Sequence, residues 1–230
     1  MNTVFMIKVI IFDLDGTVAD TIYAIREGVN LTMSALGYPE HTYEEVLGFV
    51  NFGARHLIEE ALPASVRGDQ TVVDQTLALY DRMYAQTYLH TDRCYDGIPE
   101  ALEILHRDFR LAMLSNKQDA MVQGLVRQLF RPGLFAIAHG VRDGLPTKPD
   151  KTVPLQYCEE LGVTPVECAF VGDSDVDVAT AKNAGMLAVD VTWGYRSEEV
   201  LRQKGADLLA HTPGELVEIF QKLKSQGGPA

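Results

Sequence analysis

Short apolar runs that alternate with longer helical patterns constrain the fold of this chain more than any other feature of its sequence. Runs with the composition of β-strands cover residues 8–12, 111–114, 169–171 and 187–191, with weaker ones at 135–138 and 207–209. Helical patterns lie between them, at residues 98–107, 121–130, 152–161 and 176–184. The runs show little apolar–polar alternation, as expected for strands that are covered on both faces. The sequence therefore predicts an α/β fold, a doubly wound Rossmann-like parallel sheet with helices on both faces.

One long stretch interrupts this alternation. No segment between about residues 20 and 95 has the pattern of a strand. Apolar side chains there recur at helical spacing, first at Ile22, Ile25, Val29 and Met33. Thr42 followed by Glu45 fits the capping box that opens a second helix, and further helices are predicted at residues 54–62 and 71–88. We therefore expect an all-helical cap domain, residues 20–95, inserted into a core made of residues 1–19 and 96–230.

The net charge and the cysteine content of the chain limit the kinds of partner and the cell compartment that are expected. The 230-residue chain has a formal net charge of −12, which argues against a nucleic-acid partner because most of the surface would repel phosphates. Its cysteines, Cys94, Cys158 and Cys168, are odd in number and lack metal-ligand spacing, which favours a reducing compartment. The apolar N-terminal run is too short for a membrane span and shows no signal-peptide pattern. A soluble cytoplasmic protein without a membrane partner is expected.

Two carboxylates follow the first predicted strand. Asp13 and Asp15 stand directly after the run at residues 8–12, and Gly16 turns the chain. Side chains at positions i and i+2 of an extended chain point the same way, so the two carboxylates can converge on one point. Two like charges this close repel each other, and a site that tolerates them normally holds a cation or a proton. The alternative is an Asp-Gly turn with both carboxylates solvated.

Polar residues also follow other strands of the predicted sheet, at the edge where open parallel sheets bind ligands. These residues are Ser115, Asn116 and Lys117 after one run, Asp173 and Asp177 after another, and Lys148 in a loop stiffened by prolines. Each has a simpler interpretation. Ser115 fits a helix N-cap, where free N–H groups would also suit phosphate. The two lysines fit solvated surface positions, and the two aspartates fit acids at a helix start. Because four separate segments gather at one edge, a functional site is the better interpretation.

The same four segments, in this order, resemble the motifs of the haloacid dehalogenase superfamily in its phosphatase branch. The matching segments are Asp13-Leu14-Asp15-Gly16-Thr17, then Ser115-Asn116-Lys117, then Lys148-Pro149, and finally Gly172 through Asp177. Their order and spacing agree over nearly the whole chain. The resemblance implies an α/β core, a helical cap that closes over small substrates, and a Mg²⁺-dependent phosphatase.

The resemblance also implies a role for each catalytic residue. Asp13 would be the nucleophile that forms an aspartyl-phosphate, and Asp15 the general acid and base. Ser115 and Lys148 would hold the transferring phosphoryl group, with Asn116 beside them in the second motif as a substrate-binding residue. When a carboxylate attacks phosphorus, the metal and the lysine must neutralise the negative charge of the equatorial oxygens. Most of the catalysis is expected to come from this neutralisation.

A magnesium site is implied by the same motifs. The resemblance places Mg²⁺ on Asp13, Asp173 and the backbone carbonyl of Asp15, with Asp177 supporting the metal or its waters. The four carboxylates total −4, Lys148 and Mg²⁺ contribute +3, and a proton on Asp15 brings the sum to zero. A phosphate dianion can then approach without strong net repulsion, and the same proton serves the leaving group. Hard oxygen ligands favour Mg²⁺ over zinc.

Two further features separate branches of the superfamily. Dehalogenases of this family lack the second motif-one aspartate, so Asp15 favours phosphoryl transfer. Phosphonate-cleaving relatives use a cap lysine, and no lysine lies between Lys8 and Lys117. Residues 51–55 resemble the cap loop of phosphoglycolate phosphatases. Arg55 in this loop is a candidate to clamp a substrate carboxylate bidentately, or else a surface helix residue.

The sequence therefore predicts a phosphatase for a small phosphorylated metabolite, phosphoglycolate-like or a sugar phosphate, acting as a monomer or homodimer. A β-phosphoglucomutase-like phosphomutase shares all four motifs and the helical cap, and a pyrophosphatase or nucleotide phosphatase is also open. From another class, a non-catalytic phosphate-sensing protein would keep the acidic pocket without turnover. Receiver domains of that kind, however, lack the second motif-one aspartate and any helical insert.

Overall fold

A six-stranded parallel sheet forms the centre of the computed structural model, which describes residues 6–91 and 93–226. Its strands, in spatial order, are β5 (Phe135–Val141), β4 (Arg110–Gln118), β1 (Val9–Phe12), β6 (Cys168–Gly172), β7 (Leu187–Val191) and β8 (Leu208–Ala210). All neighbouring strands are parallel. The chain order runs outward from β1 in both directions, so the polar loops after β1, β4 and β6 meet at the switch point of the sheet.

Helices cover both faces of the sheet because its central strand is apolar on both. One face carries α5 (Ile98–His106), α6 (Asp119–Leu129) and α10 (Pro213–Gln226), and the other carries α7 (Thr152–Glu160) and α8 (Asp175–Ala184). Ile10 and Phe12 pack in the first buried cluster, and Val9 and Ile11 in the second. All four side chains are 0 % exposed, and burying such a side chain contributes roughly 1.5–3 kcal/mol relative to leaving it exposed. The central strand thus fixes both layers and, with them, the position of the loop that begins at Asp13.

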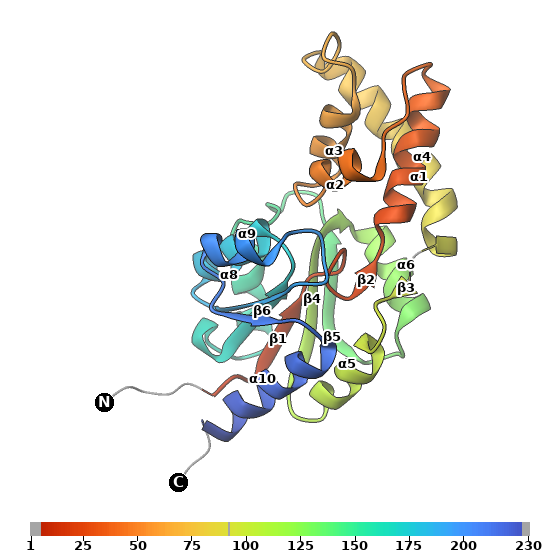
Figure 1. Cartoon of the computed structure of the whole chain (residues 1–230). Helices are drawn as coiled ribbons and strands as arrows, with labels where there is room; N and C mark the ends of the chain where they lie inside the picture. The colour runs from red at the N-terminus through yellow and green to blue at the C-terminus, as the bar shows by residue number, and fades with distance from the viewer. Residues whose placement is uncertain (1–5, 92, 227–230) are drawn as a thin grey trace.

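Four helices form a separate group beyond the carboxyl edge of the sheet, at the top of Figure 1. They are α1 (Ile22–Ala35), α2 (Tyr43–Phe49), α3 (Ala54–Ala61) and α4 (Gln70–Thr91). The capping box predicted at Thr42 is present, since its Oγ1 accepts from Glu45 N and its own N–H donates to the Glu45 carboxylate. A two-stranded antiparallel ladder of β2 (Ala19–Asp20) and β3 (Arg93–Cys94) joins this group to the core. The predicted helical insert is therefore observed, and its division at residues 20 and 95 stays a prediction.

The predicted α/β sheet is confirmed, but some element bounds differ. Strand β4 is predicted to end at residue 114, yet it continues to Gln118 because its last residue pairs with Val141 of β5. Pairing in the sheet here outweighs the low strand propensity of the polar second motif. Four short elements were not predicted from the sequence, nor was α10: α9 (Glu198–Lys204), the 3₁₀ turn η1 (Pro165–Glu167) and the strands β2 and β3. The prediction of no strand between about residues 20 and 95 is therefore wrong at its two ends, where β2 and β3 pair.

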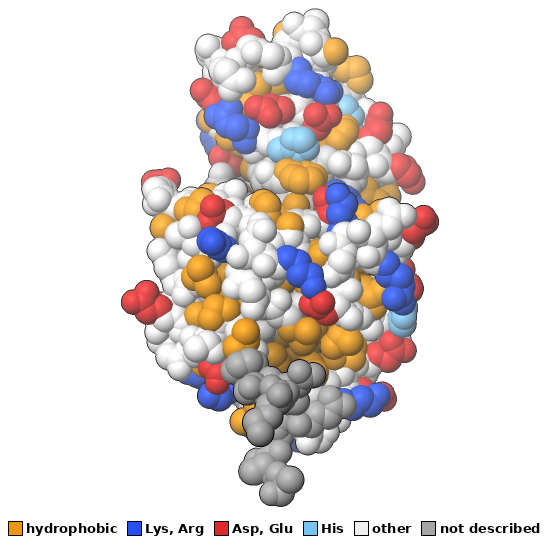
Figure 2. Space-filling view, turned by 90° about the vertical axis from the view of Figure 1, so that its left-hand side faces the viewer, with side chains coloured by type: hydrophobic (Ala, Val, Ile, Leu, Met, Phe, Trp, Pro, Cys, Tyr) orange, Lys and Arg blue, Asp and Glu red, His pale blue; other side chains and the backbone are white. Residues whose placement is uncertain are grey.

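Figure 2 shows acidic, basic and apolar side chains interspersed over one face, with a narrower upper lobe on a larger lower one. Within residues 6–91 and 93–226, every helix is too short or too polar to cross a bilayer.

Candidate active site

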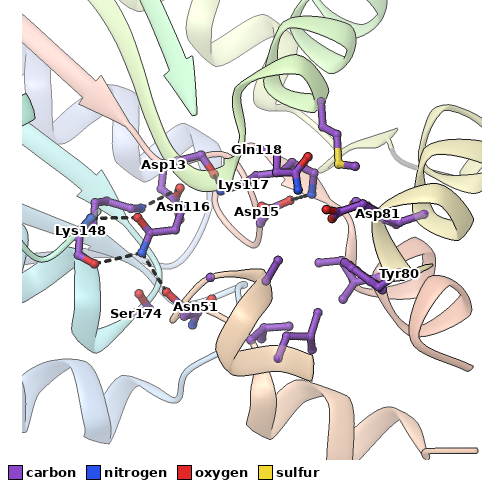
Figure 3. Close-up of a pocket in the computed structure, with 18 residues that line it drawn as sticks. Asp13, Asp15, Asn51, Tyr80, Asp81, Asn116, Lys117, Gln118, Lys148 and Ser174 are labelled. Carbon is purple, nitrogen blue, oxygen red and sulfur yellow. Dashed lines mark hydrogen bonds and ion pairs between the residues drawn. The ribbon is translucent and has the colours of Figure 1, made fainter. Parts of the chain in front are cut away.

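Side chains from four segments of the core meet under the cap, at the carboxyl end of the sheet (Figure 3). A pocket there is lined from the core by Asp13, Asp15, Ser115, Asn116, Lys117, Gln118, Met121, Lys148 and Ser174. From the cap region it is lined by Ile25, Val50, Asn51, Gly53, Ala54, Leu57, Tyr80, Asp81 and Tyr84. All four predicted motifs therefore open onto a common pocket between core and cap, the fourth through Ser174.

Asp13, Asp173 and Asp177 form a buried group of carboxylates. Each offers one oxygen, and these oxygens all lie within 4.8 Å of one another. The three residues are exposed by only 6 %, 0 % and 1 %. Three negative charges are strongly disfavoured together in such an interior unless a cation joins them. Because every donor is a hard oxygen, the residues fit a divalent cation such as Mg²⁺.

Lys148 is held as a fixed positive charge beside this group. Its Nζ lies 2.8 Å from Asp13 Oδ1 and 2.6 Å from Asp177 Oδ1. Burial lowers the pKa of a lysine, but Asp13 and Asp177 outweigh that effect and raise the pKa of Lys148, so it stays an ammonium. Asn116 fixes the loop, because its Oδ1 accepts from Lys148 N at 2.9 Å and its Nδ2 donates to Lys148 O at 3.0 Å. Asn116 is thus a positioning residue for Lys148, and its contact with substrate stays a prediction.

Two simpler interpretations of the second motif are wrong. Ser115 is not a helix N-cap, since it lies in β4 and α6 begins at Asp119 with Gln118 at the N-cap position. It is only 3 % exposed and lines the pocket. Lys117 is not solvated, because the extended backbone of β4 turns its side chain into the pocket, where it is 5 % exposed. The motif therefore presents its polar groups from a strand and not from a helix start.

Asp15 lies apart from the three-carboxylate group and has its own partners. Its Oδ1 accepts from Lys117 Nζ at 2.6 Å and from Thr21 Oγ1 at 2.6 Å. The hydroxyl of Tyr195 lies 2.9 Å from Thr21 Oγ1 and extends this chain of hydrogen bonds. The side chain of Asp15 is thus placed for proton transfer at the pocket and away from the cation group. Its predicted contribution to the metal is through its backbone carbonyl and stays a prediction.

Burial raises the pKa values of the carboxylates that would hold the cation. In the metal-free protein, desolvation raises the pKa of Asp13 to about 7, with Lys148 opposing and Asp177 and Asp15 adding to the rise. Desolvation also raises the pKa of Asp173 well above its usual value, reinforced by Asp177 and Asp13. A bound divalent cation would favour the charged carboxylates and so lower the pKa values of Asp13 and Asp173. The group is therefore poised to exchange protons for a metal ion.

The loop after β7 also belongs to the site, although it was not predicted. Tyr195 N donates to Asp173 Oδ2 at 2.6 Å, and Thr17 Oγ1 donates to Asp173 Oδ1 at 3.1 Å. Trp193 Nε1 in turn donates to Thr17 O at 3.0 Å. These bonds orient the Asp173 carboxylate. The sequence could have indicated this loop, because the strand at residues 187–191 is predicted and the loop after it lies at the same edge of the sheet.

Comparison with known proteins decides the family. The family model for haloacid dehalogenase-like hydrolases matches residues 7–185, which is most of the chain and includes all four motifs. The chain belongs to this family. The predictions of this superfamily and of a phosphoric monoester hydrolase within it are therefore confirmed, since the curated relatives described next are phosphoglycolate phosphatases.

The relatives of this haloacid dehalogenase-like hydrolase match it along nearly its whole length. A phosphoglycolate phosphatase of Vibrio parahaemolyticus is 33% identical over 219 residues, covering 93% of this chain and 96% of the relative. One of Pseudomonas putida is 34% identical over 221 residues, covering 94% of this chain and 78% of the relative. A solved structure from Lactobacillus delbrueckii, described provisionally as a phosphoglycolate phosphatase, has a TM-score of 0.87 at 29% identity and covers 94% and 99%. The helical cap and the core are thus both shared with the relatives.

Arg55 is the predicted substrate-binding residue that lies outside the pocket lining of this hydrolase. It lies near the start of α3, where its guanidinium donates to Gln70 Oε1 at 3.2 Å and pairs closely with Asp74 on α4. It is absent from the pocket lining described above. Because these partners lie on the neighbouring cap helix, the contacts tie α3 to α4. A substrate-clamping role for Arg55 stays a prediction that this arrangement does not favour.

The start of α8 can lie close to the end of β6 because residue 172 is a glycine. A Cβ at Gly172 would lie 2.1 Å from Asp177 Cβ, so Gly172→Ala must move the start of α8 away from β6. We expect a loss of kcat/KM on the order of 100-fold, because catalysis falls steeply when a site shifts by about 1 Å. Phosphate release measures it, with Gly48→Ala as the control, since a Cβ there meets nothing within 4 Å. Activity close to wild type in Gly172→Ala would contradict the tight packing.

Proposed function

We propose that this protein is a Mg²⁺-dependent phosphatase that hydrolyses a small phosphomonoester through an aspartyl-phosphate on Asp13. The observation that supports it best is the convergence of Asp13, Lys148, Asp173 and Asp177 in one buried cluster that opens onto a pocket. The cluster combines a nucleophilic carboxylate, a fixed ammonium and a set of oxygen ligands. These are the parts that in-line phosphoryl transfer requires.

The proposed reaction has two steps that share one acid–base residue. A carboxylate oxygen of Asp13 attacks phosphorus, the bond from phosphorus to the leaving oxygen breaks, and Asp15 gives its proton to that oxygen. Asp15 then takes a proton from a water molecule that attacks the phosphorus of the aspartyl-phosphate. The bond to Asp13 breaks, and inorganic phosphate leaves with Asp13 regenerated. In the view of Figure 3, Asp15 lies between Lys148 and Asp81, where it can serve the leaving group.

The charges of the cluster support binding of a phosphate dianion. Asp13, Asp173, the backbone carbonyl of Asp15 and, through waters, Asp177 would hold Mg²⁺, which when bound neutralises charge on the phosphoryl oxygens. Lys117 was not counted in the charge balance from the sequence, and its buried ammonium adds +1. The site is therefore neutral with Asp15 ionised and carries +1 once Asp15 is protonated. Ser115, with its buried side chain at the pocket, adds a hydroxyl donor.

Names of relatives give a first set of substrates. The curated relatives are phosphoglycolate phosphatases, so phosphoglycolate and sugar phosphates are the first candidates. A phosphomutase remains the runner-up because water or a bound sugar hydroxyl can receive the phosphoryl group at the same site. A structure described provisionally as a β-phosphoglucomutase, from Thermotoga maritima, shares the fold at a TM-score of 0.72 and 21% identity.

A panel of phosphometabolites tests the proposal. Phosphate release is measured for phosphoglycolate, sugar phosphates, nucleotides, pyrophosphate and p-nitrophenyl phosphate, with Mg²⁺ and with EDTA. We expect release that requires Mg²⁺ and needs no bisphosphate activator. Release only with an activator would favour the mutase, and no release from any member of the panel would favour a phosphate-sensing protein.

The position of Arg55 predicts the outcome of its removal. Arg55→Ala is expected to lower kcat/KM for carboxylated and neutral phosphates by the same small factor, because the guanidinium is paired with Asp74 outside the pocket. The measurement is the ratio of kcat/KM for phosphoglycolate to that for a neutral phosphomonoester in Arg55→Ala and wild type. A loss of kcat/KM confined to carboxylated substrates would instead support a substrate-clamping role for Arg55.

A further inference from the structure

The pocket has a second end, away from Lys148, where Asp15 is the residue with a step in the proposed phosphoryl transfer. We call it the leaving-group end and define it by Asp15, Asp81, Lys117, Gln118 and Tyr80 (Figure 3). Asp15 must reach the leaving oxygen, so the rest of the substrate lies among these side chains. Their donors, acceptors and charges therefore decide which leaving group the protein accepts.

Asp81 gives this end an unsatisfied acceptor. It projects from α4 of the cap, and among the described cap residues that line the pocket it is the one carboxylate, with no lysine or arginine beside it. Its Oδ1 is buried and has no hydrogen-bond partner, although Gln118 at the same end hydrogen-bonds the carboxylate and partly offsets the rise in its pKa that burial causes. A buried acceptor without a donor destabilises the protein, so a ligand that supplies a donor here binds more tightly than one that does not.

The cation at this end is already engaged. Lys117 Nζ lies 2.6 Å from Asp15 and 4.9 Å from the centre of the Tyr84 ring. With Asp15 ionised, the leaving-group end carries −1, counting Lys117, Asp15 and Asp81. With Asp15 protonated as the acid, it carries zero. A substrate carboxylate would make even the second state negative, whereas a neutral hydroxyl leaves it balanced.

We propose that Asp81 is a specificity-determining residue that selects a neutral, hydroxyl-bearing leaving group over a carboxylated one. A hydroxyl of the substrate donates to Asp81 Oδ1, and a carboxylate in its place meets the negative charge of Asp81. The inference rests on the proposed phosphatase function and narrows its substrate class to phosphates of polyols and sugars. It differs from the substrate named for the curated relatives.

A matched pair of substrates tests this directly. Hydroxyethyl phosphate and phosphoglycolate differ only in CH₂OH against COO⁻ at the end remote from phosphorus. We expect wild type to prefer hydroxyethyl phosphate by about tenfold or more in kcat/KM, since a site built to bind a hydroxyl rejects analogues that lack it. In Asp81→Asn that ratio is expected to fall by about tenfold, chiefly through a lower KM for phosphoglycolate.

Controls separate the role of Asp81 from a general change in charge or fold. Glu44→Gln removes one exposed cap carboxylate outside the pocket, and its substrate ratio is expected to equal that of wild type. Inhibition of wild type by a hydroxyalkyl phosphonate and its carboxyalkyl counterpart reports the same preference without a variant. The hydroxyalkyl compound is expected to bind about tenfold more tightly.

The outcomes are distinguishable. A wild-type preference for phosphoglycolate, or an unchanged ratio in Asp81→Asn, overturns the role of Asp81 while leaving the phosphatase intact. So does equal or tighter binding of the carboxyalkyl phosphonate. Absence of phosphate release from both substrates and from p-nitrophenyl phosphate overturns the phosphatase, and the inference with it.

Discussion

Asp13→Asn is expected to abolish phosphate release while leaving the fold intact. The amide cannot attack phosphorus, and it also removes one oxygen ligand from the group that Asp13 forms with Asp173 and Asp177. Loss of a nucleophile lowers kcat by about 10⁴–10⁶-fold in well-studied covalent enzymes. The fold tolerates the change because Asn has the shape of Asp and relieves repulsion among buried carboxylates. The measurements are kcat with Mg²⁺ and the Tm of the same preparation.

The control for Asp13→Asn is Asp175→Asn. Asp175 lies in the first turn of α8, near the same site, but it pairs with Arg196 at 3.6 Å and stands outside the three-carboxylate group. We expect its kcat to stay within about tenfold of wild type, as is usual for loss of a partly exposed ion pair. Turnover close to wild type in Asp13→Asn, or an equal loss in both variants, would contradict a covalent role for Asp13.

Asp190→Asn is expected to stabilise the metal-free protein increasingly as the pH rises. Asp190 lies in β7 beside Gly172, is 1 % exposed, and neither carboxyl oxygen has a hydrogen-bond partner. Burial, reinforced by Asp177 and Asp173, raises its pKa from 3.8 to about 9. Because the folded state binds this proton more tightly than the unfolded state, wild type loses stability between about pH 4 and pH 9. An asparagine side chain at position 190 is also polar, but it does not ionise.

The size of the stabilisation by Asp190→Asn follows from the pKa shift of Asp190. At pH 7 the Asp190 carboxylate must take up a proton on folding, which costs up to about 4 kcal/mol of folding free energy. At about 2–4 °C per kcal/mol for a chain of this length, Asp190→Asn is expected to raise Tm by up to roughly 8–16 °C. The difference from wild type is expected to vanish near pH 4.

Thermal unfolding in EDTA from pH 4 to 9 measures the effect of Asp190→Asn. The matched control is Glu218→Gln, which removes an exposed carboxylate of α10 and is expected to leave Tm within about 1–2 °C of wild type. A Tm difference for Asp190→Asn that is independent of pH would contradict the raised pKa.

The core of the fold was predictable because its signal is local and repeated. The runs at 8–12 and 169–171 are apolar without alternation, which only strands covered on both faces tolerate, and both became central strands. Helix α10 escaped prediction although Leu216 and Phe220 lie four residues apart and are buried. Charged residues between them, such as Glu218, obscured the apolar stripe.

The candidate site was predictable where a motif fixes the residue, and not where packing does. Asp13, Lys148 and Asp173 could be named from the order of their motifs, and the structure places them together. The pairing of Lys117 with Asp15 could not be predicted, because it depends on β4 continuing past residue 114 through its pairing with β5. Whether Arg55 faces the pocket depends in the same way on how α3 packs against α4, which no local pattern encodes.

Rapid acid quench with a radiolabelled phosphomonoester tests the central claim, that Asp13 carries the phosphoryl group, most directly. The account predicts protein-bound label within the first turnover, located in the peptide that contains Asp13, released by hydroxylamine as an acyl phosphate should be, and absent from Asp13→Asn. Phosphate release by wild type with no labelled protein at any quench time, or label on a different residue, would contradict it.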